Sequence, residues 1–127
     1  FTGDIASDVA EAYAVLFEAE AAAVKAATIG TPCEEVDAVA RRIITAAGFG
    51  DYFIHRTGHG IGLDAHEDPY IVLGNRTPLV VGNAYSVEPG IYLPGEFGFR
   101  LEDIVVVTSS GAESITNAER SLVSVEA

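Results

Sequence analysis

The sequence predicts an α+β fold over residues 1–127, in which two helices precede a sheet. Apolar residues recur twice at helical spacing before Gly48, which indicates two amphipathic helices. Beyond Gly50 the pattern changes to short β-type runs separated by Gly, Pro and Asn. No second change in composition marks a domain boundary, and 127 residues are enough to form one hydrophobic core. We therefore expect a single domain.

Two helices are predicted from capping residues and apolar stripes. The first begins at Ser7 and Asp8, which suit a cap and a first turn, and extends towards Gly30. Its apolar positions are Val9, Tyr13, Leu16, Phe17 and Val24. The second begins with residues 31–34 (Thr-Pro-Cys-Glu), a pattern typical of a capping box with proline at the first helical position, and ends at Gly48. Its predicted buried stripe comprises Val36, Val39, Ala40, Ile43, Ile44 and Ala47.

Residues 84–88 are predicted to form a strand. Side chains alternate between the two faces of a strand, so Tyr85 and Val87 share one face, while Ser86 and Glu88 share the other. Pro89-Gly90 is expected to end this strand.

A longer strand is predicted from residues 97 to 107, with Arg100 and Glu102 on one face. Residues 109–111 (Ser-Ser-Gly) suit a hairpin turn. The tail after Asn117 is expected to form a short final helix or strand.

Charge and composition restrict the possible partners and location. Nineteen acidic against seven basic residues give a net charge of -12, without a Lys/Arg cluster, which argues against a nucleic-acid partner. No apolar run approaches the roughly 20 residues that span a bilayer, so no membrane association is expected. The lone Cys33 agrees with a reducing compartment, and we expect a cytoplasmic protein. The absence of Met and the start at Phe1 suggest a piece of a longer polypeptide.

All three histidines, His55, His59 and His66, fall within the glycine-rich residues 55–66. Imidazole is the commonest metal ligand and is readily tuned for proton transfer near neutral pH. A single histidine is more often a hydrogen-bonded structural residue, but three together favour a chemical role. The flanking glycines permit close approach and positive φ, which predicts a loop of demanding shape.

Glu88 and Glu102 lie in otherwise apolar strands, where a carboxylate needs a partner. One interpretation is an ion pair, in which Arg100 pairs with either glutamate. The other is a metal site formed by His59, Glu88 and Glu102. This donor set suits Zn, Mn, Co or Fe, and is poor for copper(I) or an iron–sulfur cluster. Residue spacing alone leaves both interpretations open.

Three segments together resemble a known family: Gly-His-Gly-Ile-Gly at 58–62 followed by His66-Glu67, Ser-Val-Glu-Pro-Gly-Ile-Tyr at 86–92, and Arg-Leu-Glu-Asp at 100–103. They are similar to the M24-like pita-bread metallopeptidases of the creatinase, aminopeptidase P and prolidase group, with the strongest likeness to bacterial Xaa-Pro dipeptidases. The resemblance covers essentially the whole chain. It implies the C-terminal half of a pita-bread catalytic domain, with a curved and mainly antiparallel sheet.

The resemblance also implies a dinuclear metal centre. His59 and Glu88 would bind one metal ion, Glu102 would bridge both ions, and Glu88 would handle the proton of the attacking water. Manganese is the expected metal, with cobalt or zinc as alternatives. Paired divalent ions lower the pKa of a bridging water and polarise a carbonyl.

Further roles follow from the same resemblance. His55 and His66 would hydrogen-bond the substrate and the tetrahedral intermediate, and Arg100 would support the carboxylates. Three acids are expected to be solvated or supporting rather than catalytic: Asp64, Glu67 and Asp68. The implied substrate is an Xaa-Pro dipeptide or short peptide, and a homodimer is possible because family members often dimerise.

Two metal ligands of the family are aspartates that precede the matching region. Asp4 and Asp8 are poor substitutes, because they suit helix capping. We therefore expect residues 1–127 alone to bind metal weakly, or as a single ion, and to have no appreciable peptidase activity.

Other functions remain possible at this point. The main alternative is a non-catalytic pita-bread module that binds peptides or proteins, since fold alone does not determine function. The presence of His59, Glu88 and Glu102 favours the enzyme, and it argues against the metal-free creatine-hydrolysing branch. A β-barrel oxygenase would be expected to carry a His-x-His pair, which this chain lacks. Dipeptidase and aminopeptidase specificities are not separated by these residues.

Overall fold

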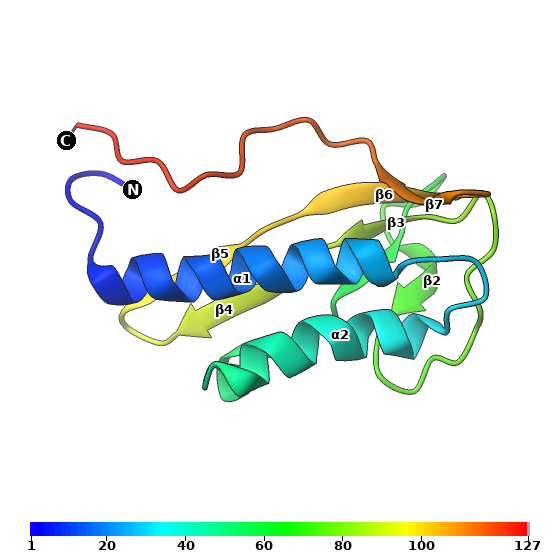
Figure 1. The fold of residues 1–127 in the computed structure, drawn as a ribbon, viewed down its shortest axis with the longest axis horizontal. Coiled ribbons are helices and arrows are strands. Elements are labelled where there is room, and N and C mark those ends of the chain that lie inside the picture. Colours follow the sequence, from blue (N-terminus) through cyan, green and yellow to red (C-terminus); the bar gives the residue numbers. More distant parts are fainter. Residues whose placement is uncertain (127) are drawn as a thin grey trace.

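Helices precede strands in the computed structural model, which describes residues 1–126 (Figure 1). The helices are α1 (Ser7–Ala26), α2 (Cys33–Ala46) and the short 3-10 helix η1 (Gly50–Tyr52). The strands are β1 (Gly58–Gly60), β2 (Glu67–Ile71), β3 (Ala84–Val87), β4 (Gly90–Leu93), β5 (Phe97–Arg100), β6 (Asp103–Thr108) and β7 (Gly111–Ser114). The predicted α+β order is confirmed.

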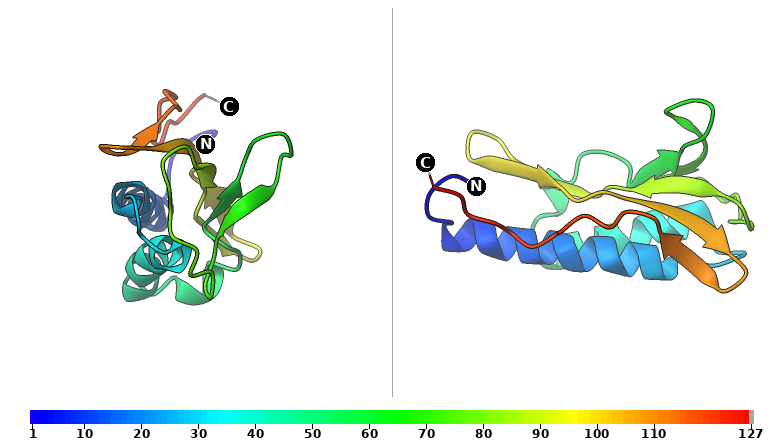
Figure 2. Two further views of the ribbon diagram at one scale, coloured as in Figure 1. Left: turned by 90° about the vertical axis from the view of Figure 1, so that its right-hand side faces the viewer. Right: turned by 90° about the horizontal axis from the view of Figure 1, so that it is seen from above.

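All strand pairs within the two sheets are antiparallel. The larger sheet has the order β2-β1-β3-β6-β7, and β4 pairs with β5 in a separate ribbon. Helices α1 and α2 lie side by side against one face of the larger sheet (Figure 2). The core between these layers includes Leu16, Ala19, Val36, Ile44, Tyr85 and Val105. None of the helices described in residues 1–126 is long and apolar enough to cross a bilayer.

The start of α1 differs from the prediction. Ala6 occupies the N-cap position without a side-chain hydrogen bond, and Ser7 lies inside the helix. The carboxylate of Asp8 accepts a hydrogen bond from the Val9 backbone N–H at 2.9 Å. Phe17, expected in the apolar stripe, is 42% exposed. The buried positions of α1 are Val9, Ala12, Leu16, Ala19, Glu20 and Ala23.

The predicted capping box of α2 is wrong. Pro32 is the N-cap residue, and no side chain caps the helix. Instead, the 75–77 loop supplies acceptors: the backbone N–H of Cys33 donates to Thr77 O at 3.0 Å and that of Glu34 donates to Asn75 O at 2.8 Å. Of the predicted stripe, Val36, Ala40 and Ile44 are fully buried, Val39 and Ile43 are half-buried, and Ala47 is exposed.

The single strand predicted for residues 97–107 is two strands in different sheets. β5 pairs with β4, whereas β6 pairs with β3. Between them, the backbone N–H of Leu101 donates to Pro89 O at 3.3 Å. The partner segment also changes sheet, at Glu88-Pro89 between β3 and β4. The two segments therefore pass together from the larger sheet into the β4-β5 ribbon. This break places Glu88 and Arg100 at the junction of the two sheets.

The C-terminal segment begins after the predicted hairpin turn, which is confirmed between β6 and β7. The predicted final helix or strand after Asn117 is wrong within the described residues, because the chain is irregular there. The segment runs back along α1 (Figure 2). It ends beside the N-terminus, where Thr2 and Val125 form an isolated parallel bridge.

Gly48 follows α2 with a φ of +89°, as expected of a helix stop.

A buried charge cluster ties this segment to α1 and β6. The side chains of Glu20 and Asp103 are 0% and 1% exposed, and one guanidinium serves both: Arg120 lies 3.2 Å from Glu20 Oε2 and 2.6 Å from Asp103 Oδ2. Burial, with the nearby charge of Asp103, raises the pKa of Glu20 to about 7. The folded state therefore favours the protonated form of Glu20.

We expect Glu20→Gln to stabilise the protein at high pH. Because the folded pKa of Glu20 is raised, its contribution to stability is present below pH 4.5 and is lost as pH rises through about 7. A glutamine cannot ionise, so the variant should exceed the native protein by about 1–3 kcal/mol near pH 8. Thermal denaturation of both proteins from pH 4 to 8 measures this difference. A constant difference across that range would contradict the prediction.

Candidate active site

Within the histidine-rich stretch, residues 58–60 form the strand β1, and the predicted loop follows at residues 61–66. β1 lies between β2 and β3 in the sheet. A Cβ at Gly58 would lie 1.8 Å from Ser86 O, and one at Gly60 would lie 2.3 Å from Asp68 O. Neither glycine has a positive φ. These glycines are therefore required for close approach of the neighbouring backbones, and His59 is the residue of β1 that carries a side chain.

Replacing Gly58 with alanine should open the sheet beside this histidine. The added methyl group would collide with the Ser86 carbonyl, which belongs to backbone and cannot rotate away. We expect a loss of about 1–3 kcal/mol or more in unfolding free energy, measured by denaturant titration. Gly74→Ala is the comparison, because Gly74 has a positive φ but open space around it, and its expected cost of about 1–2 kcal/mol should be the smaller of the two losses. Equal losses would contradict the close-approach argument.

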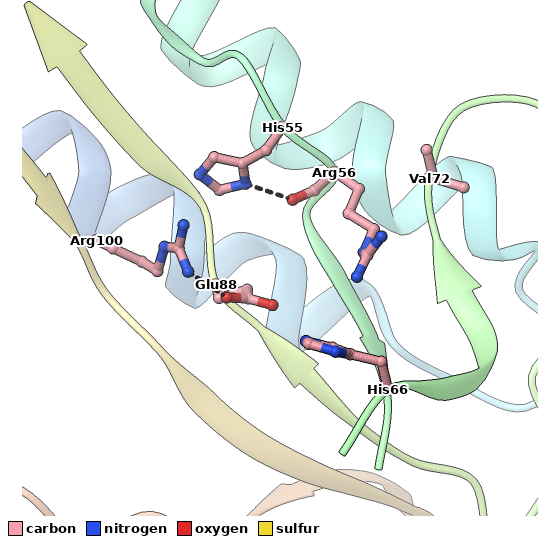
Figure 3. A pocket seen from close by; sticks show the side chains of 6 residues that line it. All are labelled: His55, Arg56, His66, Val72, Glu88 and Arg100. Carbon is pink, nitrogen blue, oxygen red and sulfur yellow. Dashed lines mark hydrogen bonds and ion pairs between the residues drawn. The ribbon is translucent and has the colours of Figure 1, made fainter. Parts of the chain in front are cut away.

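A cavity of about 470 Å³ lies where the two sheets meet (Figure 3). Its lining residues are His55, Arg56, His66, Val72, Glu88 and Arg100. Four of these six were predicted as site residues from the sequence: His55, His66, Glu88 and Arg100. The volume is in the range of ordinary small-ligand pockets.

His59 and Glu88 form a buried pair beside the cavity. Each is 7% exposed, and His59 Nε2 lies 3.0 Å from Glu88 Oε1. The backbone N–H of His59 donates to Ser86 Oγ at 3.0 Å, and its Nδ1 lies 3.0 Å from Gly60 O. The backbone pairing of β1 with β3 thus brings together two residues that are far apart in the sequence.

The atoms of this pair fit a divalent cation. A carbonyl oxygen only accepts, so the contact with Gly60 O places the proton of a neutral His59 ring on Nδ1. Nε2 then presents a lone pair to the carboxylate oxygen of Glu88, which is also an acceptor. Two facing acceptors need a proton or a cation between them. Imidazole nitrogen and carboxylate oxygen are both good ligands for zinc and related ions.

Three further contacts hold Glu88. Ser86 Oγ donates to Glu88 Oε1 at 3.0 Å, Arg100 donates to Oε2 at 2.9 Å, and the Glu88 backbone N–H donates to Thr57 O at 2.7 Å. The Arg100 ion pair expected as one interpretation is thus present, and it is compatible with the other. Arg100 binds one carboxylate oxygen, while the second oxygen faces His59.

His55 belongs to a chain of hydrogen bonds that ends at Arg100. Its Nδ1 lies 2.7 Å from Arg56 O, so the neutral ring accepts through Nε2 from the Tyr92 hydroxyl at 3.2 Å. The Tyr92 oxygen accepts in turn from Arg100 Nε at 2.9 Å. Desolvation lowers the pKa of Arg100, but the bond to Tyr92 and the nearby glutamates outweigh it and raise the pKa overall. Arg100 therefore stays charged.

Glu102 and His66 are exposed, in contrast to the buried pair of His59 and Glu88. Within residues 1–126, no three His, Cys, Asp or Glu side chains lie close enough to hold a metal ion. The structure thus brings His59 and Glu88 together but leaves Glu102 outside, exposed at the break between β5 and β6. His66 is also exposed, and its ring centroid is 4.1 Å from that of His59. The metal role of Glu102 remains a prediction.

A buried aspartate on α2 supports the strand from behind. Asp37, 1% exposed, accepts hydrogen bonds from the backbone and hydroxyl of Thr57 at 3.0 and 2.8 Å. Arg41 binds both carboxylate oxygens of Asp37 at 3.0 Å. It also donates to Phe53 O at 3.1 Å and His55 O at 3.0 Å. This Asp37–Arg41 clamp fixes the backbone that carries His55 and leads into β1.

Sequence reasoning missed the clamp and two residues near the cavity, Arg56 and Tyr92. Asp37 and Arg41 are spaced i, i+4, which is a common surface ion-pair pattern on helices. Only the position of Asp37 inside the buried stripe could have indicated a structural role. Arg56 and Tyr92 lie within motifs already singled out, next to a histidine and after Glu88-Pro89-Gly90. The spacing of these motifs does not show the direction of the Arg56 and Tyr92 side chains.

Two helices over an antiparallel sheet, with a buried His–Glu pair beside a polar cavity, agree with the pita-bread metallopeptidase class that the sequence motifs resemble. The sequence profile of metallopeptidase family M24 matches residues 1–109. The chain belongs to this family.

Individual relatives agree with this assignment. The chain is 53% identical to the probable dipeptidase PepE of Mycobacterium tuberculosis, over 95% of this chain and 32% of that protein. It is also 53% identical to an Xaa-Pro dipeptidase of Lactobacillus helveticus, over 88% of this chain and 30% of that protein. The chain thus spans about a third of the length of these relatives.

Solved structures of relatives have the same fold. The dipeptidase PepE of Mycobacterium ulcerans superposes with a TM-score of 0.97 at 53% identity, over 99% of this chain and 34% of that one. A prolidase of Thermococcus sibiricus superposes with a TM-score of 0.95 at 46% identity, over 98% of this chain and 34% of that one. The predicted pita-bread fold is confirmed.

Proposed function

We propose that the full-length protein is a metal-dependent dipeptidase that hydrolyses Xaa-Pro dipeptides. The names of the relatives support the reaction class. The observation that carries the proposal is the buried contact of His59 Nε2 with Glu88 Oε1, 3.0 Å apart, in which two acceptors face each other beside the cavity. A cation between them would explain why both residues are buried there.

Each side chain has a role in this proposal. Divalent ions, manganese first and cobalt or zinc as alternatives, would polarise the scissile carbonyl and lower the pKa of the attacking water. His59, Glu88 and Glu102 would be their ligands in this chain. Glu88 would accept the proton of the water and pass it to the leaving amine. Arg100 would keep Glu88 oriented through Oε2.

The two remaining histidines would serve the substrate. His66 is exposed beside His59 and is free to donate to the carbonyl oxygen as negative charge develops. His55 would contact the substrate from the opposite part of the cavity wall, where Tyr92 holds its ring. Residues 1–127 alone are proposed to lack appreciable activity, because His59, Glu88 and Glu102 are fewer ligands than a centre with two metal ions needs.

Hydrolysis of Ala-Pro by the full-length protein tests the proposal. The protein would be stripped of metal with a chelator and reconstituted with Mn²⁺, Co²⁺ or Zn²⁺, and proline release would be measured. We expect activity only after reconstitution, and faster hydrolysis of Ala-Pro than of Ala-Ala. Activity that survives verified metal removal would refute the mechanism. Tight peptide binding without hydrolysis would favour the non-catalytic module.

A further inference from the structure

Arg56 is the charged cavity residue that the proposed mechanism does not use. Its guanidinium carbon lies over the Tyr70 ring, 4.9 Å from the ring centroid. Within residues 1–126 its side chain makes no hydrogen bond and no ion pair. Arg100, in contrast, is bound to Glu88 and Tyr92. The cavity therefore contains one engaged guanidinium and one whose hydrogen-bond donors are available.

The position of Arg56 suits an anionic part of a ligand. Figure 3 shows its guanidinium on the other side of Glu88 from Arg100, between His66 and Val72. A guanidinium presents a planar set of donors that matches a carboxylate with two parallel hydrogen bonds. Stacking on Tyr70 restrains the side chain, so less conformational freedom is lost on binding. The half-buried setting screens the charge less than open solvent would.

Dipeptides differ from longer peptides in the position of their free carboxylate. In an Xaa-Pro dipeptide it belongs to the proline whose nitrogen forms the scissile bond, and the carboxylate carbon lies only about 2.5 Å from that nitrogen. Arg56 and Glu88 line the same cavity. We propose that Arg56 is a specificity-determining residue that binds the C-terminal carboxylate of the dipeptide. This inference rests on the proposed function and names the substrate feature that its site selects.

The experiment compares Ala-Pro with Ala-Pro-amide, which has the same scissile bond but no carboxylate, using the full-length enzyme. The native enzyme should prefer Ala-Pro. Arg56→Gln should lower kcat/KM for Ala-Pro by about 10- to 100-fold, mainly through KM, and leave kcat/KM for the amide unchanged. Arg56→Lys should retain part of the preference, because it keeps the charge and loses the planar fork.

Arg76→Gln is the matched control. It removes the same charge, but Arg76 is 87% exposed, pairs with Glu34 and lies outside the cavity lining, so both substrates should be unaffected. Equal losses of Arg56→Gln on both substrates would assign Arg56 a structural role through Tyr70 and overturn the inference. No loss on either substrate would overturn it too.

The native enzyme itself separates the two proposals. If it cleaves the amide as fast as the dipeptide, Xaa-Pro hydrolysis stands and the role of Arg56 fails. If it cleaves neither substrate after metal reconstitution, the proposed function fails and this inference fails with it. Circular dichroism of each variant establishes that it is folded, and Arg56→Lys provides a second reading should Arg56→Gln fail to fold.

Discussion

Replacing Glu88 with glutamine in the full-length enzyme is expected to reduce kcat for an Xaa-Pro dipeptide by about 10³-fold or more. Glutamine has nearly the same shape but cannot accept the proton of the attacking water, and it is a weak metal ligand. Its amide can donate to His59 Nε2, which lies 3.0 Å from the present oxygen, so the local packing should survive. We therefore expect kcat, measured by steady-state kinetics, and the metal content per chain to fall together, with little change in thermal stability.

Glu113→Gln provides the control for this substitution. Glu113 is an exposed carboxylate on β7, remote from the cavity lining, and its loss changes the net charge by the same amount. The control should retain the native kcat and metal content. A Glu88→Gln enzyme that keeps more than about a tenth of the native kcat would be incompatible with a role of Glu88 in proton transfer.

Asp37→Ala is expected to destabilise the protein by about 3–5 kcal/mol, because it leaves a half-buried guanidinium and two Thr57 donors without their acceptor. Asp37 is 1% exposed and accepts bonds from Arg41 and Thr57 at once. The Thr57 carbonyl in turn accepts from the Glu88 backbone at 2.7 Å. A shift here should therefore reach Glu88. Denaturant unfolding of the full-length protein, with kcat measured at a temperature where the variant is folded, checks both effects.

An exposed ion pair on the same helix gives the comparison. Arg42 and Glu35 lie 2.9 Å apart, with side chains 63% and 51% exposed. Solvent screens such a pair, so Glu35→Ala should cost less than about 1 kcal/mol and leave kcat unchanged. If Asp37→Ala cost no more than Glu35→Ala, the Asp37–Arg41 clamp would not be a significant support of the site.

Local sequence patterns predicted the two helices but not the groups that cap them. Helical periodicity located both of them, because burial of one apolar stripe is what makes a short helix stable. The predicted caps failed, because the free N–H groups at a helix N-terminus donate to any suitably placed oxygen. At α2 the 75–77 loop provides two backbone carbonyls, and the Glu34 carboxylate binds the Gly74 backbone N–H instead of its own helix. Such partners are distant in sequence, and spacing does not reveal them.

The candidate site was likewise predicted only in part from the sequence. Family-like motifs predicted His55, His59, His66, Glu88 and Arg100, and the structure gathers these five residues in and beside one cavity. Glu102 shared a predicted strand face with Arg100, but the chain breaks between β5 and β6 and Glu102 lies outside the group. The apolar run of residues 104–107 continues the β-type pattern beyond that break, so composition could not show it.

The sequence by itself determined the order of helices and strands, the glycine-flanked histidines and the chemistry available at Glu88. These depend on local periodicity and on the donor atoms of single residues. Only the tertiary structure decided that Gly58 and Gly60 serve close strand approach and that Asp37 supports Thr57. It also decided that Arg56 lines the cavity without a side-chain hydrogen bond to any of residues 1–126. Each of these depends on which backbone passes beside which, and that is the outcome of long-range pairing and packing, summed over many weak contacts.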